Sequence, residues 1–156
     1  MNVRKSFRAL CEERLRELTV PHPFEITAFC ESVSLTRGKP LVLTAAPMTP
    51  TADSCPYGLW VGFDHADHIY YEQNTSPLHQ AAIILHEVSH ILLGHPSDVA
   101  DLAEMLPDVD PAKVRYWLSR HTGLTVPTTQ ELQAELFSTL ILERATTTRS
   151  RSRRTG

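Results

Sequence analysis

The sequence predicts an α+β domain, with a small sheet that precedes a helix bearing two histidines. Three observations lead to this prediction. Apolar residues recur at helical spacing near both ends of the chain, and two short β-prone runs lie close together at 58–63 and 68–73. Between them and the last helical pattern lies an apolar run with the two histidines. A chain of 156 residues has the length of one domain, which we expect over residues 1–145.

The first third of the chain is expected to hold two helices and a strand. Residues 3–18 predict an amphipathic helix, because apolar side chains recur at helical spacing and Arg and Glu take the other face. Residues 24–36 predict a second helix followed by a short extended piece, since their period is mixed. Residues 40–47 begin and end with proline and predict a strand. The apolar face of the first helix comprises Val3, Phe7, Leu10, Cys11, Leu15 and Leu18.

The middle of the chain predicts a loop, a hairpin and a helix. Residues 48–58 are rich in turn-forming residues, and the two β-prone runs that follow are joined by "DHAD", which is typical of a hairpin. Ser76 and Pro77 then form an N-cap with proline at the first helical position. The helix is expected to run to Gly94, where glycine and the next proline end it.

The C-terminal part is expected to be helical and then disordered. Residues 97–127 predict one or two short helices, and a last helix starts at Thr128 or Thr129 and runs through "ELQAELFSTLILERA". Residues 146–156 show no apolar periodicity and predict a disordered basic tail. The residues of the last helix that are expected to pack in the core are Leu132, Leu136, Phe137 and Leu140.

The composition argues against several classes of function. Five arginines lie in residues 144–156, which leaves residues 1–143 with 10 basic against 18 acidic residues, a net charge of −8. Such an acidic body argues against direct nucleic-acid binding. The N-terminus lacks the apolar core of a signal peptide, and no segment reaches the roughly 18 apolar residues of a membrane span, so a cytoplasmic protein is expected. The three cysteines show no C-x-x-C spacing, which predicts neither a disulfide framework nor a cysteine zinc site.

The run "IILHEVSHILLGH" at 83–95 indicates a metal site. At 3.6 residues per turn, His86 and His90 lie about 40° apart on one helix face, so both imidazoles can bind one ion. Glu87 lies about 100° round the helix from His86, where it can act as a general base toward a water on the metal. The alternative is a buried helix whose imidazoles bind no metal. Three polar side chains inside an apolar run favour the metal, because an ion compensates their desolvation.

The third ligand of such an ion can be sought in two places. His95 lies five residues after the second histidine, whereas the metzincin pattern needs six, so it is expected to interact with the helix C-terminus instead. The last helix offers Glu131 and Glu135, which are four residues apart and lie on one face. Glu131 could instead form a capping box with Thr128, which would leave Glu135 as the ligand.

A hairpin, the motif "LHEVSHILLGH" and, some forty residues later, "ELQAELFSTLIL" together resemble the ImmA/IrrE type of metallopeptidase, whose second motif reads approximately Glu-x-x-Ala-(Asn/Asp)-x-Phe-Ala. The resemblance covers residues 57–143. It implies a minimal zincin-like domain of the gluzincin type, in which a small sheet packs on an active-site helix and a glutamate-bearing helix. By this alignment Glu131 is the third zinc ligand, Ala134 the small residue and Phe137 the core aromatic. Glu135 departs from the pattern, because it stands where the family has Asn or Asp.

The resemblance implies a zinc-dependent endopeptidase in which His86, His90 and Glu131 hold Zn(2+) and Glu87 is the general base. Members typically act in the cytoplasm on a regulatory protein, often a helix-turn-helix repressor, which they cut or release from DNA. Members often carry a helix-turn-helix domain on the same chain, but we expect no such domain in this sequence. A DNA-binding partner is therefore expected to be a separate protein. Two alternatives remain: a non-catalytic zinc module that sequesters a partner protein, and a toxin- or antitoxin-linked hydrolase with a non-peptide target.

Peptide hydrolysis also needs a donor to the developing oxyanion. Tyr57, Tyr116 and His121 are the candidates in this sequence, and each could equally be a half-buried polar aromatic residue. The run at 58–63 could present an edge strand to an extended substrate, or it could lie inside the sheet.

Overall fold

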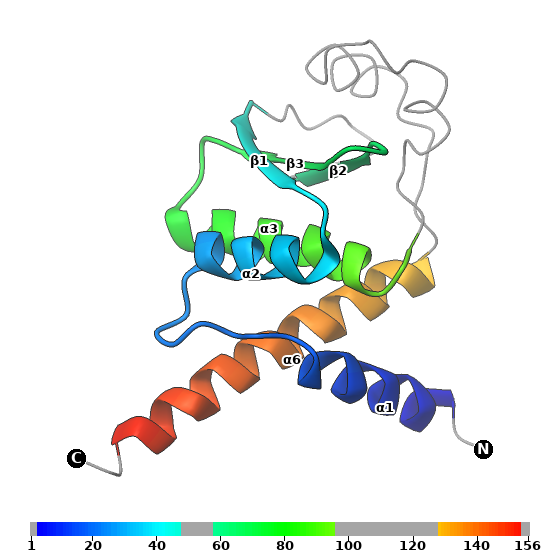
Figure 1. The fold of residues 1–156 in the computed structure, drawn as a ribbon, viewed down its shortest axis with the longest axis vertical. Coiled ribbons are helices and arrows are strands. Elements are labelled where there is room, and N and C mark those ends of the chain that lie inside the picture. Colours follow the sequence, from blue (N-terminus) through cyan, green and yellow to red (C-terminus); the bar gives the residue numbers. More distant parts are fainter. Residues whose placement is uncertain (1–2, 48–57, 96–127, 154–156) are drawn as a thin grey trace.

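The computed structural model describes residues 3–47, 58–95 and 128–153. In this part of the chain the elements form three layers (Figure 1), with the sheet above, α2 (Ile26–Arg37) and α3 (Pro77–Leu92) in the middle, and α1 (Val3–Arg16) and α6 (Thr128–Arg153) below. Helix α3 contacts two strands of the sheet on one side and α6 on the other, while α2 contacts β1 and α1 contacts α6. The predicted α+β class is confirmed for the described residues, and α3 lies at the centre of the arrangement.

Helix α1 spans Val3–Arg16, within the range that the sequence predicts. Its buried residues include Cys11 and Leu15, and Arg144 of α6 donates a hydrogen bond of 2.6 Å to the backbone oxygen of Leu15. Leu10 was expected on the apolar face, but it is 42% exposed. The buried stripe of this helix is therefore narrower than its composition suggests.

Helix α2 spans Ile26–Arg37 and corrects the prediction of a helix followed by an extended piece. Glu25 caps its first turn, since its carboxylate accepts hydrogen bonds from the backbone of Thr27 at 2.9 Å and Ala28 at 2.8 Å. Gly38 ends it in the left-handed region, at φ 66°. Val33 is 1% exposed, so burial and the two caps keep the mixed segment helical despite its β-branched residues.

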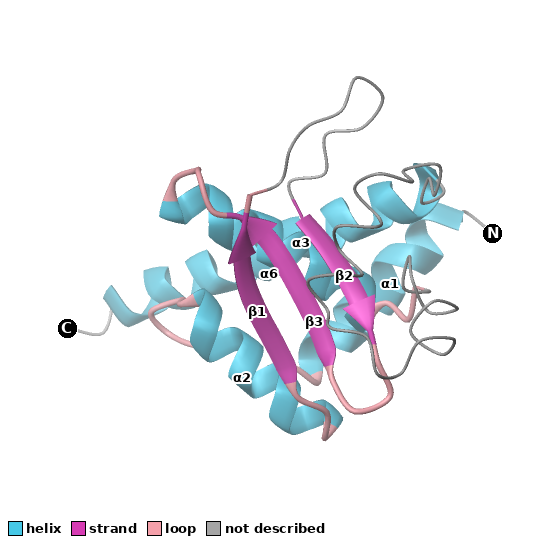
Figure 2. Ribbon diagram, turned by 90° about the horizontal axis from the view of Figure 1, so that it is seen from above, coloured by secondary structure: helices cyan, strands magenta, loops and turns pink. Residues whose placement is uncertain are grey.

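The described strands are β1 (Leu41–Ala46), β2 (Gly58–Gly62) and β3 (Asp67–Glu72), in the order β1-β3-β2 (Figure 2). The predicted hairpin is confirmed, because β2 and β3 pair antiparallel, with Trp60 opposite Ile69. Strand β1 lies parallel to β3, a pairing that the local sequence pattern does not indicate. In the described part of the chain, β2 therefore forms one edge of the sheet.

Asp67, at the start of β3, ties the sheet to the end of α2. Its side chain is 1% exposed and accepts hydrogen bonds from the Trp60 indole at 3.0 Å and from Lys39 at 3.4 Å. The guanidinium of Arg37 also pairs with it. A buried carboxylate needs such partners to offset its desolvation.

Helix α3 spans Pro77–Leu92 and follows the predicted start and stop signals. The Ser76 hydroxyl accepts a hydrogen bond of 3.1 Å from the backbone of His79, and Gly94 follows the helix in the left-handed region, at φ 73°. Its buried face packs on the sheet and on α6. The core cluster includes Ile84, Leu85 and Val88 of this helix, Ile69 of the sheet, and Phe137, Leu140 and Ile141 of α6.

Helix α6 spans Thr128–Arg153, so it starts where the sequence predicts and continues beyond Ala145. The expected disordered tail is therefore helical as far as Arg153, because the segment contains no glycine or proline that would end the helix. Leu132 and Leu136 were expected in the core, but they are 63% and 38% exposed.

Several predictions lie outside the described residues. They concern the loop at 48–57, the short helices at 97–127 and the oxyanion donors Tyr57, Tyr116 and His121. Among the helices that the structure describes, none is both long and apolar enough to span a membrane.

Candidate metal centre

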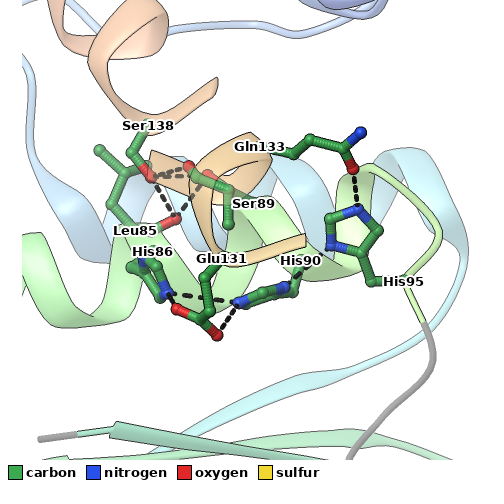
Figure 3. Close-up of polar contacts among 9 residues, drawn as sticks. Leu85, His86, Ser89, His90, His95, Glu131, Gln133 and Ser138 are labelled. Atoms are coloured by element: carbon green, nitrogen blue, oxygen red, sulfur yellow. Dashed lines mark hydrogen bonds and ion pairs between the residues drawn. The ribbon is translucent and has the colours of Figure 1, made fainter. Parts of the chain in front are cut away.

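Two helices bring three ligand groups together (Figure 3). His86 and His90 lie one turn apart on α3, and Glu131 lies in the first turn of α6. The carboxylate oxygens of Glu131 lie 2.9 Å from Nε2 of His86 and 3.2 Å from Nε2 of His90. The two Nε2 atoms are 3.2 Å apart. One ligand atom of each residue thus faces the same small volume, and the group could hold a metal ion.

The spacing of these atoms suits zinc. A zinc ion binds nitrogen and carboxylate oxygen at about 2.0–2.1 Å in a tetrahedral arrangement, so neighbouring ligand atoms lie about 3.3 Å apart. The Nε2–Nε2 and carboxylate–imidazole distances are within a few tenths of an ångström of that value. Two imidazoles and a carboxylate are also a donor set that zinc accepts, and a cation between them would satisfy all three groups at once.

Among the residues that the structure describes, the three side chains differ in exposure. The His90 side chain is 6% exposed, that of His86 is 23% exposed and that of Glu131 is 44% exposed. Within the described part of the chain, a metal held by these three residues would be more covered on the side of His90 than on the side of Glu131. Three protein ligands would leave one position of a tetrahedral ion for a water or another small molecule.

The structure distinguishes between the two candidate glutamates. Both carboxylate oxygens of Glu131 contact imidazoles, whereas Glu135 is exposed and does not belong to the group of convergent ligands. The two residues lie one turn apart on α6, and Glu131 is the one whose carboxylate reaches the histidines of α3.

Small residues allow α3 and α6 to approach closely beside the centre. Ser89 donates a hydrogen bond of 2.8 Å to the backbone oxygen of Leu85, and Ser138 donates one of 2.7 Å to that of Ala134. The two hydroxyl oxygens lie 2.9 Å apart, and Ala134 is fully buried. Larger side chains here would push the helices apart and carry Glu131 away from the histidines.

Glu87 lies on the sheet side of α3, under the first residue of β2. A Cβ atom added to Gly58 would lie 3.2 Å from Oε1 of Glu87 and 2.6 Å from Cγ2 of Ile83. Only glycine allows β2 to pass this close to α3. The half-buried Glu87 therefore lies between the two candidate histidine ligands in the sequence and beside an edge strand of the described sheet in space.

Burial lowers the pKa of His90 to about 4. The neighbouring His86 and His95 act in the same direction, whereas Glu131 opposes the shift. His90 is therefore neutral at pH 7, which is the form that binds a metal.

We expect zinc-free protein to lose stability as the pH falls from 6.5 toward 4. The folded state holds the pKa of His90 below its ordinary value of 6.5, so the unfolded chain binds the proton first and unfolding is favoured within this window. The measurement is urea unfolding in the presence of a chelator, at pH 7 and pH 5, for wild type and His90→Gln. The wild type should lose more of its free energy of unfolding than the variant does, and equal losses would contradict the prediction.

His95 is not one of the three convergent ligands, but it contacts the side of the His90 ring that faces away from Glu131. Its Nδ1 is 2.9 Å from Nδ1 of His90, and its Nε2 is 2.8 Å from Oε1 of Gln133 (Figure 3). From the sequence we expected His95 to interact with the C-terminus of the helix, and no role was predicted for Gln133. Gly94 is the signal that could have indicated the contact, since a left-handed residue turns the chain back toward the last helical turn.

Comparisons of the chain with protein-family models, with curated proteins and with solved structures find no match.

Proposed function

We propose that this protein is a zinc-dependent endopeptidase of the ImmA/IrrE type. The observation that carries the proposal is the contact of Glu131 with both His86 and His90, across 45 and 41 residues of sequence. These three residues would hold the zinc, and Glu87 lies on the same helix as a base. The proposed substrate is a separate regulatory protein of the cytoplasm, in keeping with the resemblance, and a helix-turn-helix repressor is the candidate class.

The residues of this chain divide the chemistry between them. When bound, zinc lowers the pKa of a coordinated water to about 7 and polarises the scissile carbonyl. Glu87 would accept a proton from the attacking water as the new C–O bond forms, and it would then pass this proton to the leaving amine as the peptide C–N bond breaks. Glu87 is not one of the three convergent ligands, so the proton transfer would not require any ligand to dissociate from the metal.

The position of β2 supports a peptide as the substrate. This strand lies at an edge of the described sheet, and its first residue, Gly58, is next to Glu87. An extended peptide that pairs with an edge strand presents its backbone at regular intervals along that edge. Pairing along β2 would therefore place a peptide bond close to the general base.

The proposal predicts metal-dependent cleavage of peptides. Zinc-loaded protein is incubated with a mixed-sequence peptide library, and new termini are identified by mass spectrometry. Cleavage is expected with zinc and is expected to stop when a chelator removes the metal. A chain that binds zinc and cuts none of the peptides would contradict the endopeptidase and favour the non-catalytic module.

A further inference from the structure

The end of α3 folds back on one of the proposed ligands. The backbone N–H of His95 donates a hydrogen bond of 3.0 Å to the carbonyl of His90, and that of Gly94 donates one of 3.1 Å to Ile91. With Gly94 at φ 73°, these two bonds form a Schellman motif, which places the residue after the glycine against the residue five positions before it. The two residues brought together here are His95 and His90, whose ring centroids lie 5.1 Å apart.

The side-chain contacts define where the hydrogens lie. The amide oxygen of Gln133 only accepts hydrogen bonds, so Nε2 of His95 must carry the hydrogen in their 2.8 Å contact. Nδ1 of a neutral His95 is then an acceptor, and Nδ1 of His90 must donate to it across 2.9 Å. In this tautomer, Nε2 of His90 has a free lone pair, and this is the atom that faces Glu131 and His86.

Gln133 connects this chain of hydrogen bonds to the second helix of the site. It lies on α6 two residues after Glu131, so one segment of α6 contacts both ends of the His90 imidazole, directly at Nε2 and through His95 at Nδ1. A ring held at both nitrogens keeps its tautomer and its plane, and such partners commonly tune a metal-binding histidine.

We propose that His95 and Gln133 are positioning residues of the metal centre, which hold His90 with Nε2 unprotonated and directed at the ion. The inference rests on the proposed function, because it assigns these residues to the same zinc site. Neither residue belongs to the group of convergent ligands. They would act by lowering the conformational free energy needed to orient His90 before zinc binds.

The test has two readouts, the affinity for zinc and the tautomer of His90. His95→Phe keeps a ring but removes the acceptor, and Gln133→Leu keeps the size but removes the oxygen. Each is expected to weaken zinc binding about 10–100-fold, measured by competition with a chromophoric chelator. Gln133→Glu retains an acceptor oxygen and should bind zinc as the wild type does, and so should His65→Phe, a matched change at an exposed histidine.

Nitrogen-15 NMR of the zinc-free protein provides the second readout. In the wild type, His90 should carry its hydrogen on Nδ1, and the two disruptive variants should show a mixture of tautomers. Unchanged zinc affinity in both variants, or a wild-type His90 with its hydrogen on Nε2, would overturn the inference. Failure of the wild type to bind zinc would contradict the metal centre itself, and this outcome is distinguishable because the NMR measurement needs no zinc.

Discussion

Glu87→Gln is expected to leave the zinc content unchanged and to lower the rate of peptide cleavage by about 10²–10⁴-fold, the usual contribution of a positioned general base. Glutamine has the same shape, so it fits beside Gly58, but its amide cannot accept a proton at neutral pH. Zinc should remain because Glu87 is not one of the three convergent ligands. The measurement is the initial cleavage rate of a library peptide at saturating zinc, with metal content determined by mass spectrometry.

Glu13→Gln is a suitable control for this change. Glu13 is exposed on α1, in the layer of helices below α3, and the same substitution there should alter neither zinc content nor rate. A Glu87→Gln protein that binds zinc and cuts at the wild-type rate would remove Glu87 from the mechanism. Loss of zinc in this variant would instead make Glu87 part of the metal-binding group.

Glu131→Gln and Glu135→Gln should differ strongly in zinc affinity, although the two residues lie one turn apart on the same helix. Glu131→Gln removes the only charged ligand of the group, so the affinity should fall by more than the roughly 10–100-fold that loss of an outer-shell partner costs. Glu135 is exposed and outside the group, and its variant should bind zinc as the wild type does. Equilibrium competition with a chelator measures both affinities.

Thermal unfolding provides an independent measurement of the same difference. A ligand that binds only the folded state raises its stability, so zinc should raise the melting temperature of the wild type and of Glu135→Gln, but much less that of Glu131→Gln. If zinc affinity falls with Glu135→Gln and persists with Glu131→Gln, the assignment of the third ligand is wrong. If none of the three proteins binds zinc, the motif is a helix with imidazoles and the peptidase proposal fails.

Local sequence signals predicted most of the described elements. Ser76 and Pro77 start α3 and Gly94 follows its end, because caps act on the backbone within one or two turns. The β2–β3 hairpin follows from two short β-prone runs with a turn between them. In these places a few neighbouring residues determine the conformation, so a single sequence is sufficient.

The sequence was insufficient where contacts between distant parts of the chain determine the conformation or the burial of a residue. The segment at 24–36 has a mixed pattern, and burial of Val33 in the core acts together with the Glu25 and Gly38 caps to make it one helix. Leu132 and Leu136 have the composition of core residues but lie on an exposed part of α6, since only one face of that helix packs on α3. The parallel pairing of β1 with β3 likewise depends on contacts between segments far apart in the sequence.

The sequence by itself determined that His86 and His90 share one face of a helix and that Glu87 lies beside them, because 3.6 residues per turn fixes these relations locally. Only the tertiary structure decided between Glu131 and Glu135, which helical spacing makes equivalent. Which glutamate reaches the histidines depends on how closely α6 crosses α3. Buried small residues such as Ala134 set the distance between these two helices. The contact of His95 with Gln133 has the same origin, since it joins two helices whose relative position no local pattern encodes.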